Sequence, residues 1–129
     1  MISLQELENL CTDRLEDAKT LFRAGRYDGA FYLAGYVIEL GLKNKICRTL
    51  DWPGYPSLDE FRGLASFRTH DLEVLLHLSG VETKIKEHFF AEWSIAIAWR
   101  PEIRYFSRVQ TAESSNNMLT AAEKLLEQL

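Results

Sequence analysis

One charged residue, Glu39, lies inside the longest nearly apolar stretch of the sequence, positions 29–42. An ionised carboxylate is costly to bury unless it is paired, so Glu39 needs a partner. Lys43 lies one helical turn later and is within reach, and Arg100 or Arg104 could reach Glu39 from a later loop. Two roles follow for Glu39. It is a buried polar contact that holds that loop on the fold, or it is a ligand-binding or catalytic carboxylate.

The segment 100–108 is the second group of residues that could bind a ligand or take part in catalysis. It holds three arginines and two aromatic residues within nine positions: Arg100, Arg104, Tyr105, Phe106 and Arg108. Guanidinium groups bind phosphate, and both arginine and aromatic side chains stack on bases. This composition predicts a nucleotide- or RNA-binding surface, to which Glu39 and Lys43 also contribute. In the alternative interpretation, Ile103 and Phe106 pack internally and the arginines pair with the many carboxylates of the chain.

His70 is the third candidate, because it opens a predicted short helix just before Asp71. Its imidazole could meet a neighbouring carboxylate, or it could simply fix the loop as a capping residue. Neither the three histidines nor the two cysteines, Cys11 and Cys47, have a spacing typical of a metal site. We expect no metal and no cofactor, and we interpret both cysteines as small buried residues in a reducing compartment.

Helices must position these groups, because apolar residues recur at helical spacing and glycine and proline are scarce. The spacing predicts five longer helices and one short one, over about 3–23, 27–50, 57–64, 71–78, 82–99 and from 112 to the end. Ser3 with Glu6 predicts a capping box, and Gly25 and Gly80 predict helix ends. The predicted fold class is all-α, an antiparallel four- to five-helix bundle.

The helix over 27–50 is predicted to be central, because its first half is apolar on all sides. Gly35 and Gly41 would let neighbouring elements approach it closely. The loop that follows contains Trp52 and Tyr55 among prolines, and we expect both aromatic rings to be exposed, where they could belong to an interface.

Length and charge limit the classes of function. The 129 residues suit one domain, and the formal net charge of -4 gives no long-range attraction for nucleic acid. The N-terminus lacks the basic start and apolar run of a signal peptide. The longest nearly apolar stretch is too short to cross a bilayer and contains Glu39. We therefore expect a cytoplasmic protein without a membrane partner.

Three segments together resemble HEPN domains, the higher eukaryotes and prokaryotes nucleotide-binding family. Positions 25–43, which read GRYDGAFYLAGYVIELGLK, are similar to the second helix of that family. Positions 69–76, THDLEVLL, resemble its THDLxxLL segment, and positions 99–105, WRPEIRY, resemble the segment before its final helix. The three segments occur in the family order and span most of the chain.

The resemblance implies a helical bundle that is frequently a symmetric dimer. Many HEPN proteins are RNA-cutting toxins or defence effectors, others partner a minimal nucleotidyltransferase, and others are non-catalytic binding modules. The nuclease motif of the family is an arginine followed, after four to six residues, by a histidine near the start of the last helix. In the dimer, two such motifs cleave RNA without metal, using the ribose 2′-hydroxyl.

This sequence departs from the nuclease motif. Arg100, Arg104 and Arg108 lie in the corresponding region, but no histidine follows them, and the last histidine of the chain is His88. We therefore expect a non-catalytic HEPN-like homodimer that binds a nucleotide, RNA or a nucleotidyltransferase partner, in a toxin–antitoxin or defence context. The alternative is a divergent metal-independent ribonuclease. In that case Arg104 would stabilise the scissile phosphate, and proton transfer would come from Tyr105, Glu39 or His70.

Overall fold

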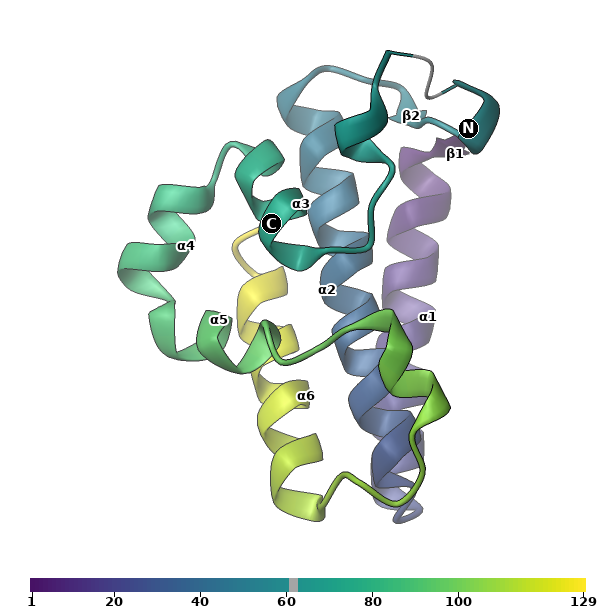
Figure 1. Ribbon diagram of the computed structural model, residues 1–129, viewed down its shortest axis with the longest axis vertical. Helices are drawn as coiled ribbons and strands as arrows, with labels where there is room; N and C mark the ends of the chain where they lie inside the picture. Colours follow the sequence, from purple (N-terminus) through teal and green to yellow (C-terminus); the bar gives the residue numbers. More distant parts are fainter. Residues whose placement is uncertain (61–62) are drawn as a thin grey trace.

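Two long antiparallel helices, α1 (Leu4–Arg23) and α2 (Tyr27–Thr49), form the frame of the fold (Figure 1). The computed structural model describes residues 1–60 and 63–129. Ser3 and Glu6 form the predicted capping box at the start of α1. The turn between the two helices uses Gly25 at φ 75°, a backbone conformation that glycine adopts without a steric penalty. The sequence prediction of this helical hairpin is therefore confirmed.

Helix α2 is the central element, as its apolar sequence predicts. It packs against α1, against α3 (Leu72–Ser79) and against the last helix, α6 (Ala112–Leu126). Ala34, Val37 and Ile38 are fully buried, and Glu39 is only 1% exposed. A Cβ atom at Gly35 would lie 2.0 Å from the ring of Trp99, and one at Gly41 would lie 2.7 Å from Leu126. Both glycines therefore provide the close approach that the sequence indicates.

The helix predicted over 82–99 is two helices, so that prediction is wrong in its length. The chain forms α4 (Glu82–His88) and α5 (Phe90–Ala96), and Phe89 between them has non-helical angles, φ −130° and ψ 33°. The bend allows α4 to pack against α3 while α5 packs against α6. After α5, a 3-10 helix, η3 (Pro101–Tyr105), occupies most of the predicted loop. Helix α6 begins after a capping box between Thr111 and Ser114. Helix α3 ends at Gly80, which adopts the left-handed conformation as predicted.

The segment between α2 and α3 differs most from its prediction. It contains a strand, β2 (Gly54–Tyr55), which pairs antiparallel with β1 (Ile2–Ser3). Short 3-10 turns follow, η1 (Leu58–Glu60) and η2 (Ala65–Phe67), in place of the helix over 57–64, of which positions 61–62 lie outside the described residues. Tyr55 is 3% exposed, because the strand pairing holds the loop against α2, so its predicted exposure is wrong.

Trp52 is partly buried and its ring lies 5.0 Å from that of Phe67, so it is not an exposed aromatic either. The described part of the chain is thus predominantly helical, as predicted, with one small two-stranded sheet. None of the helices described has both the length and the apolar character of a membrane span.

Candidate functional site

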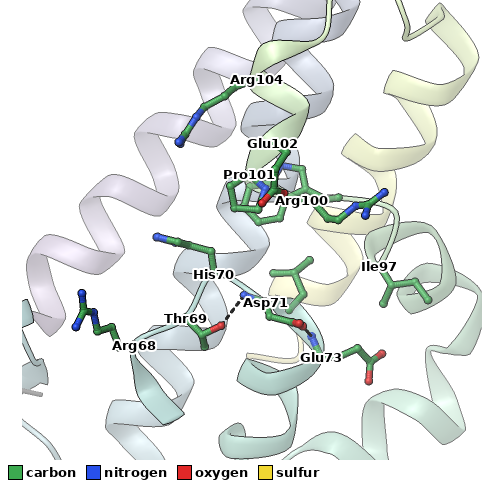
Figure 2. A pocket seen from close by; sticks show the side chains of 12 residues that line it. Arg68, Thr69, His70, Asp71, Glu73, Ile97, Arg100, Pro101, Glu102 and Arg104 are labelled. Atoms are coloured by element: carbon green, nitrogen blue, oxygen red, sulfur yellow. Dashed lines mark hydrogen bonds between the residues drawn. The ribbon is translucent and has the colours of Figure 1, made fainter. Parts of the chain in front are cut away.

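A cleft of about 760 Å³ lies between the segment that leads into α3 and the segment that follows α5 (Figure 2). Its first wall is formed by residues 68–73, and its second by Ile97, Trp99 and residues of η3. Trp99 anchors the second wall to α2, because its ring packs on Gly35 and its Nε1 donates a hydrogen bond to the carbonyl of Tyr32 at 2.9 Å. The cleft therefore joins two segments that are about thirty residues apart in sequence.

Glu39 lies beneath the cleft and holds His70. Its Oε1 accepts hydrogen bonds from Lys43 Nζ at 2.9 Å and from His70 Nδ1 at 2.5 Å. The three groups differ strongly in exposure: the side chains of Glu39, Lys43 and His70 are 1%, 16% and 64% exposed. The pairing with Lys43 and the contact of His70 with a carboxylate are both confirmed.

The expected pairing of Glu39 with Arg100 or Arg104 is wrong. Between the residues described, no arginine lies within 4.0 Å of the Glu39 carboxylate. Instead, Lys43 completes the environment of Glu39, and its ammonium lies 5.1 Å from the ring centroid of Tyr55. Trp99 packs on Gly35 of α2, and the side chains of Arg100 and Arg104 line the cleft instead of reaching Glu39.

The Glu39 carboxylate fixes the tautomer and the orientation of the His70 ring. Because a carboxylate accepts hydrogen bonds, Nδ1 carries the proton of this contact. In the described structure no hydrogen bond engages the second ring nitrogen, Nε2, and His70 lines the cleft. An imidazole held in this way by a buried carboxylate can accept, donate or transfer a proton at Nε2.

Three arginines line the same cleft: Arg68, Arg100 and Arg104. Across the described ranges, none of them has a carboxylate within 4.0 Å. Arg104 lies against Tyr105, with its guanidinium 3.3 Å from the hydroxyl and 5.1 Å from the ring centroid. In Figure 2 the side chains of Arg68, His70 and Arg104 extend to the same side of the pocket, whereas that of Arg100 extends the other way.

Two of the three acidic residues of the cleft are already engaged. Asp71 caps α3 by accepting hydrogen bonds from the backbone N–H of Glu73 at 2.9 Å and of Val74 at 3.4 Å. The Glu73 carboxylate accepts from Trp93 Nε1 at 2.6 Å and pairs with Lys86 at 3.1 Å. Glu102 is the third, and none of the cleft arginines lies within 4.0 Å of it. The charge that has no partner among the described residues of the cleft is therefore three arginines and one carboxylate, a positive balance.

Arg108 does not belong to this site, so its expected place beside Arg100 and Arg104 is wrong. It lines a separate hollow at the N-terminal end of α2, and its backbone is left-handed, at φ 57°. Asp28 holds this part of the loop. Its carboxylate accepts the backbone N–H groups of Arg108, of Val109 at 3.1 Å and of Gln110 at 2.7 Å. No sequence signal marks this contact, because it joins residues about eighty positions apart.

The Asp28 contact gives a pH-dependent prediction. The backbone N–H of Gln110, and then those of Arg108 and Val109, lower the pKa of Asp28. The stabilisation is therefore present above the unfolded carboxyl pKa of about 3.9 and is lost as the pH falls through the lower folded value. Asp28→Ala should lower the free energy of unfolding by about 1–2 kcal/mol at neutral pH, measured by urea denaturation. At pH about 3 the difference from wild type should shrink, and an equal difference at both pH values would contradict the assignment.

Tyr105, predicted as a binding residue, is 75% exposed, and the neighbouring Phe106 is 56% exposed. Phe106 therefore does not pack internally as the alternative interpretation expected, whereas Ile103 is partly buried against the core. The two cysteines are free. Cys47 is buried as expected, whereas Cys11 is only partly buried, and burial still raises the pKa of the Cys11 thiol to about 11, so this thiol is unreactive at neutral pH. Within residues 1–60 and 63–129, no group of three or more His, Cys, Asp or Glu side chains is arranged to hold a metal ion.

Comparison with known proteins adds no relative: no protein-family model, no curated protein and no solved structure matches this chain. The resemblance to HEPN domains thus stays a prediction from the three sequence segments.

Proposed function

We propose that this chain is a non-catalytic, HEPN-like homodimeric module whose cleft binds the phosphate groups of RNA or of a nucleotide. One observation carries the proposal. Arg68, Arg100 and Arg104 line one concave surface without a carboxylate partner among the described residues, in a chain with 19 acidic and 15 basic residues. Where acidic groups outnumber basic ones, three such arginines in one cleft favour an anion from outside the chain.

The surroundings of the arginines support a nucleic-acid ligand over a simple anion. Tyr105 is exposed beside Arg104 and offers a ring on which a base can stack. His70 Nε2 offers a further polar contact, oriented by Glu39. The proposed ligand is therefore a nucleotide or a single-stranded RNA, with phosphates on the arginines and a base on Tyr105.

The sequence resemblance extends the proposal to the biological setting. A HEPN-like module without the arginine–histidine motif would act by binding, with a minimal nucleotidyltransferase as its partner in a toxin–antitoxin or defence system. A nucleotidyltransferase gene beside the gene for this chain would support that setting.

Binding can be measured by the fluorescence anisotropy of a short labelled single-stranded RNA. We expect Arg68→Ala and Arg104→Ala each to weaken binding about tenfold, or about 1.4 kcal/mol. Each should also reduce the slope of the logarithm of the binding constant against the logarithm of the salt concentration by about one. Arg23→Ala, an exposed arginine in the last turn of α1, is the matched control and should change little. Arg108→Ala is a control within the same loop. Because Arg108 lines the other hollow, this substitution should also change the RNA affinity little.

Two results would contradict this proposal. The first is an RNA affinity that Arg23→Ala lowers as much as Arg68→Ala does, because binding would then depend on overall charge. The second is the absence of RNA and nucleotide binding at micromolar protein.

The divergent ribonuclease is the second candidate, and the hydrogen bond between His70 Nδ1 and Glu39 favours it. In this reaction His70 Nε2 would take the proton of the ribose 2′-hydroxyl, and the 2′-oxygen would attack the phosphorus while Arg104 stabilises the phosphate. The bond from phosphorus to the 5′-oxygen would break, the 5′-oxygen would take a proton from the His70 imidazolium or from water, and a 2′,3′-cyclic phosphate would remain. The purified protein would then cleave mixed RNA in the presence of a chelator. His70→Ala should lower the rate about 10²–10⁴-fold, the usual contribution of a general base, and Arg104→Ala should lower it as well. Intact RNA, or cleavage that survives both substitutions, would exclude this candidate.

A further inference from the structure

The second ring nitrogen of His70, Nε2, carries a lone pair and is accessible from the cleft. Nδ1 is the protonated nitrogen, because it donates to Glu39 at 2.5 Å, and Glu39 is in turn paired with Lys43 at 2.9 Å. A carboxylate in this position raises the basicity of Nε2 and holds the ring in one orientation. The His70 side chain is 64% exposed and lines the cleft. Its lone pair can therefore form a covalent bond as well as take a proton.

The arginines of the cleft indicate which electrophile this nitrogen would meet. Arg68 and Arg104 extend to the same side of the pocket as His70 (Figure 2), and neither has a carboxylate partner among the described residues. In phosphoryl transfer the negative charge is spread over three oxygens of the transferred group. Guanidinium groups bind such oxygens in pairs and stabilise the charge during transfer. The surroundings of Nε2 therefore favour a phosphoryl group.

We propose that His70 Nε2 is a phosphoryl acceptor whose donor is a phosphoramidate, a compound that carries its phosphoryl group on nitrogen. The Nε2 lone pair attacks phosphorus and forms a new N–P bond. The N–P bond of the donor breaks, and its electron pair leaves with the donor nitrogen, which is already protonated and departs as a neutral amine. Nδ1 keeps its proton, so the phosphorylated ring is a cation that Glu39 stabilises. Because the bonds broken and formed are of one kind, the transfer needs no further source of energy.

Phosphorylation of His70 would also regulate the cleft. The attached group carries up to about two negative charges and lies on the same wall as Arg68. It would occupy the guanidinium groups that an RNA phosphate needs, so the phosphorylated protein should bind RNA more weakly. This consequence rests on the proposed function, whereas the acceptor chemistry of His70 does not.

The two other histidines of the chain are matched controls. His77 Nδ1 lies 3.3 Å from Glu82, and its side chain is 75% exposed, but it does not line the cleft. His88 is exposed at the end of α4, and no carboxylate of the described residues lies within 4.0 Å of it. His77 thus has a carboxylate without the cleft arginines, and His88 has neither.

Phosphoramidate itself, the smallest compound of the donor class, is the probe. The protein is incubated with its potassium salt at neutral pH, the rate at each histidine is measured by peptide mass spectrometry, and 31P NMR identifies the ring nitrogen. We expect His70 to react at Nε2 about 10–100-fold faster than His88, the effect that orienting carboxylates have on histidine metal ligands. In urea the three histidines should react at similar rates, because the contacts of His70 are lost.

Arg104→Ala separates the contribution of the cleft from that of Glu39. It should slow the reaction of His70 about tenfold and leave that of His77 unchanged; the effect is smaller than the roughly 10²–10³-fold of enclosed sites because Arg104 is exposed. The phosphorylated wild type should bind RNA at least about tenfold more weakly than the unmodified protein, the loss expected for Arg104→Ala itself.

The outcomes distinguish the acceptor from the proposed function. Equal rates at His70 and His88 in the folded protein, or a His70 rate that Arg104→Ala does not change, would overturn the acceptor even if RNA binds. Selective phosphorylation of His70 in a protein that binds neither RNA nor nucleotides would overturn the proposed function and leave the acceptor. An RNA affinity that phosphorylation does not alter would overturn the regulation of the cleft.

Discussion

Lys43→Met is expected to lower the free energy of unfolding by about 3 kcal/mol, because it leaves the buried Glu39 carboxylate without its ammonium partner. The Nζ–Oε1 contact is 2.9 Å long, and Glu39 is 1% exposed, so water cannot replace the lost hydrogen bond. We expect the lower end of the range for broken buried pairs, since His70 continues to bond the same carboxylate. Urea denaturation at neutral pH measures the change.

A second variant separates a lost ion pair from lost packing. Adding Glu39→Leu to Lys43→Met removes the unpaired charge, so the double variant should be more stable than Lys43→Met alone. His70→Ala should cost much less than Lys43→Met, because the imidazole is 64% exposed. A double variant less stable than Lys43→Met would contradict the assignment of Glu39 as a charge that Lys43 stabilises.

Gly35→Ala is expected to have an effect of similar size, about 3–5 kcal/mol, which is the cost of removing a buried tryptophan from a core. The added methyl group would lie 2.0 Å from Trp99 Cδ1, so the ring could not keep its position. Trp99 is 3% exposed and holds the second wall of the cleft on α2. The variant should therefore lose stability and ligand affinity together, as measured by thermal unfolding and by RNA anisotropy.

Gly29→Ala on the same helix is the matched control. Its Cβ atom would lie 3.1 Å from the end of the flexible Leu21 side chain, which can move by a few tenths of an ångström. Since alanine also favours the helical conformation by about 1 kcal/mol over glycine, we expect little change or a small gain in stability. Equal losses for Gly29→Ala and Gly35→Ala would show that the position of Trp99 is not the cause.

The helical frame and part of the site follow from local sequence. The apolar spacing of 3–23 and 27–50, with Ser3, Glu6 and Gly25 at their ends, predicts α1 and α2 correctly. The pairing of Glu39 with Lys43 is equally local, because residues four apart lie on the same side of a helix. The break at Phe89 is not local in this sense, because no glycine or proline marks it, and it follows from packing of α4 and α5 on different neighbours.

Contacts across long sequence separations account for what the sequence did not reveal. The hydrogen bond between Glu39 and His70 depends on how the loop before α3 crosses α2, so the sequence indicated only that His70 could meet a carboxylate or act as a cap, and it did not identify Glu39. The same loop brings Arg68 to the cleft, and no sequence motif identifies Arg68 as a site residue. Arg108 is near Arg104 in sequence, but Asp28 draws its backbone to the other end of α2. Spacing along the chain therefore predicted a single surface for Arg104 and Arg108, whereas the fold places them on two separate surfaces.

Chemical-shift mapping would show directly whether the ligand binds in this cleft. Backbone amide spectra of the isotope-labelled protein would be recorded while a short single-stranded RNA is added. We predict that the largest shifts cluster at residues 68–73 and 97–105, and that Arg68→Ala weakens them. Shifts confined to the hollow around Asp28 and Arg108, or spread evenly over the surface, would contradict the assignment of this cleft as the binding site.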